Sequence, residues 1–188
     1  MGETQYTSVD GSSGTDVLIM GKSATLDLTS AFGTRFTSFE SLQGSSGMDV
    51  VTGTSDGTTF QSIDLKAGDD TFKWSGTTPF TLVDAGAGND TLTLVGAATV
   101  DFVGGMGTQF ANFEYFVGSA SADAVTVSTQ FKTVDMGAGN DRFTWSGNST
   151  SFTSVSGGSG TDTLVLGSAS TVDLSSGYGT IFTNFENL

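Results

Sequence analysis

The feature that most constrains the fold of this chain is an internal repeat. Eight times an aromatic residue is followed by two further residues, an apolar residue and then Asp, Glu or Ser. A short unit that recurs at this interval is typical of a solenoid, in which each coil stacks on the next. The eight aromatic residues stand 20 to 30 positions apart: Tyr6, Phe36, Phe60, Phe80, Phe110, Phe131, Phe152 and Phe182.

Apolar and polar residues alternate within each unit, for example at Phe72/Trp74 and Phe143/Trp145. A period of two indicates strands with one inward face, so both tryptophans are predicted to lie in the core. We therefore predict an all-β fold, a right-handed parallel β-helix or β-solenoid with coils of about 20–30 residues. The alternative is an antiparallel β-sandwich, but sandwiches do not usually repeat one turn at a fixed place.

The units group into a larger repeat of one long coil and two short ones. Each long coil carries an extra segment (25–28, 99–102 and 171–174), which we expect to project as an additional strand and turn from the same side. The whole chain, 1–188, is predicted to be one solenoid segment. Because it stops in mid-repeat, we expect a fragment of a longer array. The super-repeats are 6–79, 80–151 and an incomplete 152–188.

Composition excludes several classes of function. The chain has 20 acidic and 6 basic residues, a net charge of −14, whereas nucleic-acid binding needs clustered Lys and Arg. No apolar stretch approaches the length of a membrane span, so we expect no membrane insertion. His and Cys are both absent, which excludes thiolate chemistry, histidine bases and typical zinc sites. Oxygen ligands remain, and these suit calcium or magnesium.

Seven turns, most of them rich in glycine, place an aspartate just before a strand, and four of these turns have a second acid six positions earlier. Glycine permits the positive φ that turns carbonyls toward a common point. Stacked coils would bring the carboxylates about 4.8 Å apart, where they repel unless a cation or solvent screens them. The turn 118–123 lacks both central glycines and is left out. The candidate metal ligands are Asp10, Asp16, Asp49, Asp64, Asp70, Asp84, Asp90, Asp135, Asp141 and Asp162.

The segment 157–165 resembles the hemolysin-type (RTX) calcium-binding nonapeptide, and the turns 87–90 and 138–141 are similar to it. This resemblance implies a parallel β-roll or β-helix, calcium between adjacent turns, and export from a Gram-negative-type cell. It adds Asn89 and Asn140 to the candidate ligands. The motifs are sparser here than in the family, so we expect at most one side of the solenoid to carry a metal row. Lys66 could displace a cation from its own turn.

We therefore predict a calcium-binding structural or adhesive segment of a large secreted or cell-surface bacterial protein: a stalk, passenger or surface-layer module with Ca²⁺ at two or more turns. Turns held without metal remain an alternative. The chain would then bind a cell-surface glycan or another surface, with the segments around Phe32, Met106 and Tyr178 as candidates. Neighbouring copies stacked end to end are a further possible partner.

Two other functions are disfavoured. A polysaccharide-active enzyme is not expected, because each acid that can be placed belongs to a repeated column, and we assign no catalytic residue. Ice binding is not expected, because the third position of the seven turns holds only Ser and Ala.

Overall fold

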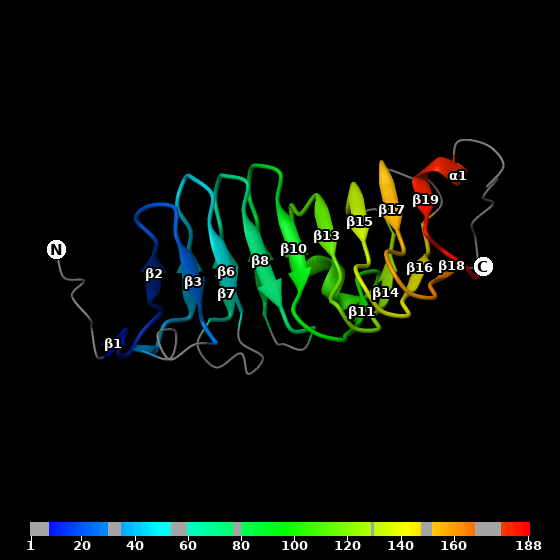
Figure 1. Cartoon of the computed structure of the whole chain (residues 1–188). Helices are drawn as coiled ribbons and strands as arrows, with labels where there is room; N and C mark the ends of the chain where they lie inside the picture. The colour runs from blue at the N-terminus through cyan, green and yellow to red at the C-terminus, as the bar shows by residue number, and fades with distance from the viewer. Residues whose placement is uncertain are drawn as a thin grey trace.

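The computed structural model describes residues 8–29, 35–53, 60–76, 80–128, 130–147, 152–167 and 178–188. These residues form a parallel β-solenoid of about six turns, seen from the side in Figure 1. All the strand pairs in it are parallel. The predicted all-β solenoid is therefore confirmed. No helix in these ranges has the length and hydropathy to cross a membrane.

The longest sheet holds eight strands and runs through most of the solenoid. Its inward file is apolar because the middle residue of each short strand faces the core and pairs with its counterpart one coil further on. The strands are β3 (Thr25–Asp27), β6 (Val50–Thr52), β8 (Thr71–Trp74), β10 (Thr91–Leu94), β13 (Tyr115–Val117), β15 (Thr133–Asp135), β17 (Ser154–Ser156) and β19 (Phe182–Thr183).

Three shorter sheets complete the coils. The five-stranded sheet contains β2 (Val17–Ile19), β5 (Ser41–Gln43), β7 (Ser62–Asp64), β9 (Leu82–Asp84) and β12 (Phe110–Ala111). The four-stranded sheet contains β11 (Thr99–Asp101), β14 (Ala124–Val127), β16 (Arg142–Trp145) and β18 (Thr163–Leu166), and the two-stranded sheet pairs β1 (Val9–Asp10) with β4 (Phe36–Thr37). The solenoid also carries a 3-10 helix, η2 (Gly105–Thr108), and a short helix, α1 (Tyr178–Ile181).

In the long coils the chain begins one sheet and ends another. The extra strand β11 pairs with β14 and starts the four-stranded sheet, while β12 pairs with β9 and ends the five-stranded sheet. In the same way β3 starts the eight-stranded sheet. The expectation that these segments project from one side was therefore wrong, because they pair into the body of the solenoid. The third segment, 171–174, lies outside the described residues.

Aromatic and aliphatic ladders fill the interior. Phe72, Trp74, Phe143 and Trp145 are all 2% exposed or less, which confirms the tryptophans as core residues. Of the eight aromatic residues of the repeat, Tyr6 lies outside the described residues and Phe36 is partly buried. The other six are buried. Each fully buried large side chain contributes roughly 1.5–3 kcal/mol, so the interior holds the coils together without disulfides.

Candidate functional site

The aspartate just before a strand, here called the exit aspartate, is buried in six of the seven turns. Asp16 is partly buried. An ionised carboxylate in such a position needs hydrogen-bond donors or a counter-charge, because desolvation penalises its charged form. The six buried exit aspartates are between 0% and 2% exposed: Asp49, Asp70, Asp90, Asp123, Asp141 and Asp162.

The exit aspartates bind one another through the backbone. The N–H of Asp49 donates to Oδ1 of Asp70 at 2.7 Å, and the N–H of Asp70 donates to Oδ1 of Asp90 at 2.7 Å. The same bond joins Asp123 to Asp141 and Asp141 to Asp162, both at 2.8 Å. Hydrogen bonds to an ionised acceptor are stronger than neutral ones, so these ladders tie each coil to the next.

Glutamates end the ladders, and sequence reasoning missed them. Oε2 of Glu114 accepts the N–H of Asp90 at 3.0 Å, and Glu40 and Glu186 accept those of Asp16 and Asp162 at 2.8 and 2.7 Å. A signal for these residues was present in the sequence. The dipeptide Phe-Glu occurs once in each long coil, at 39–40, 113–114 and 185–186.

The exit aspartates form three columns rather than one acidic edge. Asp16 and Glu40 precede strands of the five-stranded sheet. The column from Asp49 to Glu114 precedes strands of the eight-stranded sheet, and the one from Asp123 to Asp162 precedes strands of the four-stranded sheet. The exit aspartates are therefore not confined to one edge, because each long coil moves the short coils onto a new pair of sheets.

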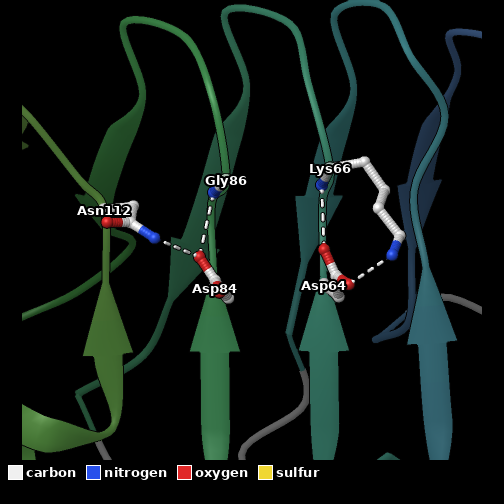
Figure 2. A network of polar contacts seen from close by, with 5 residues as sticks. All are labelled: Asp64, Lys66, Asp84, Gly86 and Asn112. Carbon is white, nitrogen blue, oxygen red and sulfur yellow. Dashed lines mark hydrogen bonds and ion pairs between the residues drawn. The ribbon is translucent and has the colours of Figure 1, made fainter.

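The second acid of a turn, here called the lead acid, lies at the end of the preceding strand and caps its own turn. Figure 2 shows Oδ1 of Asp84 accepting the N–H of Gly86 at 3.0 Å and the Nδ2–H of Asn112 at 2.7 Å. Asp10, Asp64 and Asp135 accept the N–H two residues on in the same way, at 3.0 to 3.1 Å. Such a bond is an Asx turn.

The lead acid also determines whether Oδ2 of the exit aspartate has a hydrogen-bond partner. Where a lead acid or Ser156 is present, it takes the N–H four residues before the exit aspartate. The exit Oδ2 is then buried without a hydrogen-bond partner, and we call such turns open. The open turns are those of Asp16, Asp70, Asp90, Asp141 and Asp162.

Two turns are closed by the exit aspartate itself. Gln43 and Val117 replace the lead acid there, so Oδ2 of Asp49 accepts the N–H of Ser45 at 2.7 Å. Oδ2 of Asp123 accepts the N–H of Ser119 at 2.7 Å in the same way. Both carboxylate oxygens are then hydrogen-bonded, since Oδ1 of each accepts an alanine N–H. A closed turn has no spare carboxylate oxygen for a cation.

Burial alters the acidity of the open turns. It raises the pKa of the Asp90 carboxyl to about 6, and the charges of Asp70, Glu114 and Asp69 add to the rise. Burial likewise raises the pKa of Asp141 to about 6. The pKa of Asp70 is raised for the same reason. By contrast, the hydrogen bond from the Ser12 N–H lowers the pKa of Asp10, which is a lead acid. Asp10 thus differs from Asp70, Asp90 and Asp141 in the direction of its pKa shift as well as in its contacts.

The donor set of the open turns fits a hard cation in its chemistry. Each open turn offers one buried carboxylate oxygen, and calcium prefers oxygen ligands. Among the described residues no three acidic side chains converge on a point that could hold a metal ion. A complete ligand set would therefore need oxygens besides those of acidic side chains, such as backbone carbonyls and water.

Asn140 and Lys66 have side-chain partners of their own, whereas Asn89 forms a hydrogen bond through its backbone. Oδ1 of Asn140 accepts the N–H of Thr161 at 2.9 Å, and the backbone N–H of Asn89 donates to Oδ1 of Asp69 at 2.9 Å. Nζ of Lys66 lies 2.7 Å from Oδ2 of Asp64, so its ammonium group pairs with a lead acid (Figure 2).

The long-coil segments proposed as a binding surface are only partly described. Met106 lies on η2, is partly buried and packs against the core. Phe32 and the side chain of Tyr178 lie outside the described residues. Of the three residues that marked this surface, only the side chain of Met106 is described, and it packs against the core.

Comparisons with protein-family models, with curated proteins and with solved structures found no significant match.

Proposed function

We propose that this chain is a calcium-binding structural segment of a secreted or cell-surface bacterial protein, a stalk, passenger or surface-layer module. The observation that carries the proposal is the set of five exit aspartates whose Oδ2 atoms are buried without a partner. A buried carboxylate oxygen with no donor is costly, and a cation would remove that cost. The net charge of −14 adds a general preference for cations.

The structural role is supported by the shape and the bonding of the coils. An elongated stack of coils separates β2 from β18, which lie near opposite ends of the solenoid in Figure 1. The ladders join neighbouring coils through hydrogen bonds that need no metal. Calcium would act on a preformed turn, neutralising repulsion between stacked carboxylates and stiffening the segment. Outside a cell the ion is abundant, so such a segment would be rigid there.

Thermal melting in excess calcium and in excess chelator tests this proposal. A ligand present at about 100 times its dissociation constant stabilises by about 2.7 kcal/mol per site, so the melting temperature should rise clearly with calcium. Terbium luminescence in place of calcium would report the number of sites, which should not exceed five. The proposal fails if melting in calcium and in chelator coincides. The same melting experiment with magnesium in place of calcium distinguishes a calcium site from a general response to divalent cations.

A further inference from the structure

A shallow hollow of about 330 Å³ opens where the four-stranded sheet begins, beside the closed turn of Asp123. Its floor carries only small side chains, those of Ala98, Ala122 and Ala124. These alanines break the repeat. Asp69, Asn89 and Asn140 stand at the position of Ala122 in other turns, and Thr71, Thr91 and Thr163 at that of Ala124. The missing side chains leave the space.

One guanidinium group borders this hollow. Arg142 is exposed and pairs in register with Ala124 on β14 and Thr163 on β18. Like Ala124, it occupies a position where three other coils carry threonine. No acidic side chain of the described ranges lies within ion-pair distance of it, although the chain carries an excess of 14 negative charges. Its charge is therefore available to a ligand.

The other polar groups of the hollow also leave more free hydrogen-bond donors than acceptors. Both carboxylate oxygens of Asp123 already accept backbone N–H groups, from Ala98 and Ser119, and the carboxylate forms no ion pair with Arg142. Oδ1 of Asn140 accepts the N–H of Thr161, which leaves its amide NH₂ to donate. The hollow thus combines a planar guanidinium fork and an amide NH₂ with a smooth apolar floor. This set matches a carboxylate, which a guanidinium binds through two parallel hydrogen bonds.

We propose that this hollow binds a carboxylate-bearing sugar unit of an acidic polysaccharide. The volume lies at the lower end of the range of ligand pockets, roughly 300–1,000 Å³, which suits a single sugar ring. The open, shallow form lets a longer glycan continue past the ring on the surface. The site needs no metal ion, because Arg142 supplies the positive charge and both oxygens of Asp123 already have donors. It is therefore independent of the calcium proposal.

A titration of the whole ¹⁵N-labelled chain with glucuronate, followed by NMR in excess chelator, tests the site. Glucuronate at millimolar concentration should shift the amide signals of Ala98, Ala122, Ala124, Asn140 and Arg142, whereas glucose should not. Arg142→Thr restores the residue of three other coils and so should fold, and it should weaken binding about tenfold or more. Ala124→Thr fills the floor and should weaken binding as well. Lys73→Thr removes the same charge from β8 and should bind as the parent does.

Five results would overturn the proposal. Equal shifts with glucose would show that the protein does not recognise the carboxylate of glucuronate. Unchanged binding by Arg142→Thr would show that the guanidinium is not used. An equal loss with Lys73→Thr would reduce the effect to overall charge. Shifts that follow protein concentration instead of glucuronate would assign the surface to a second copy of the chain. Binding that requires calcium would contradict a metal-free site, whatever the melting experiments show.

Discussion

The backbone N–H of Asp70 donates a 2.7 Å hydrogen bond to Oδ1 of Asp90, the aspartate at the same place in the following coil. Oδ2 of Asp90 is buried and has no partner. The two oxygens of one carboxylate thus do different things, since one ties coils together while the other stays available. This difference leads to predictions about stability and calcium response.

Without calcium, the protein should become more stable as the pH falls from about 7.5 to about 5. The folded-state pKa values of Asp90 and Asp141 are raised to about 6, above the ordinary aspartate value of 3.8. A raised carboxyl pKa means that the folded state binds more protons than the unfolded state in this pH range. The stabilisation that protonation provides is therefore fully present below the pKa of the unfolded state, and it is lost as the pH rises through the pKa of the folded state. Melting in chelator across this range checks the sign. Calcium should reverse the trend, because it binds the ionised form, and a melting temperature in chelator that rises with pH would contradict the assignment.

Asp141→Asn and Asp123→Asn should behave oppositely. The amide introduced by Asp141→Asn would keep an acceptor for the N–H of Asp123 while losing the buried charge. Stability in chelator should therefore stay level or rise, while the calcium response shrinks. At position 123 both oxygens accept N–H groups, so an amide NH₂ would oppose one donor and cost about 1–3 kcal/mol with or without calcium. Urea denaturation of both variants, with and without calcium, measures the contrast. Equal effects would remove the distinction between open and closed turns.

Gly160→Ala should be among the most damaging glycine substitutions. Gly160 has a φ of +145°, and an added Cβ would overlap the carbonyl oxygen of Gly139 in the neighbouring coil. We expect a loss of about 3 kcal/mol or more. At Gly14 the φ is +138°, but the nearest atom to an added Cβ lies 3.8 Å away, so only the backbone strain of roughly 1–2 kcal/mol should appear.

Gly21→Ala is the matched control for this pair, because an added Cβ there meets nothing within 4 Å. Its free energy of unfolding should lie within about 0.5 kcal/mol of the parent's. If denaturation ranked Gly14→Ala as worse than Gly160→Ala, the close stacking of the turns would be wrong.

Asp84→Ala should destabilise the chain by about 1–2 kcal/mol, because the N–H of Gly86 and the amide of Asn112 lose their shared acceptor. Asp84→Ser should recover most of this loss. Ser156 provides the same two hydrogen bonds in its own turn, where its Oγ accepts the N–H of Gly158 and the side-chain amide of Asn184, both at 3.1 Å. Chemical denaturation compares the two variants. An equal loss in both would mean that the charge of Asp84, and not its hydrogen bonds, stabilises the turn.

Local patterns made much of the fold predictable. Alternation around Phe72 and Phe143 predicts inward residues correctly, because strand periodicity depends only on neighbours in the chain. The aspartates before the strands were found for a similar reason, since a turn has a local signature of glycine and acid. The ladder-ending Glu114 was missed, because its partner, the N–H of Asp90, lies 24 residues away.

The sequence by itself determined that coils exist, which residues face inward, and where the acidic turns lie, because these follow from backbone geometry within one coil. Only the tertiary structure decided how the coils stack. The stacking register placed β11 at the start of a sheet, split the exit aspartates into three columns, and brought the N–H of Asp70 to Oδ1 of Asp90, 20 residues further on. The physical reason is that a carboxylate oxygen bonds to whichever donor the fold brings within reach, and the donors to Oδ1 of the buried exit aspartates come from a neighbouring coil.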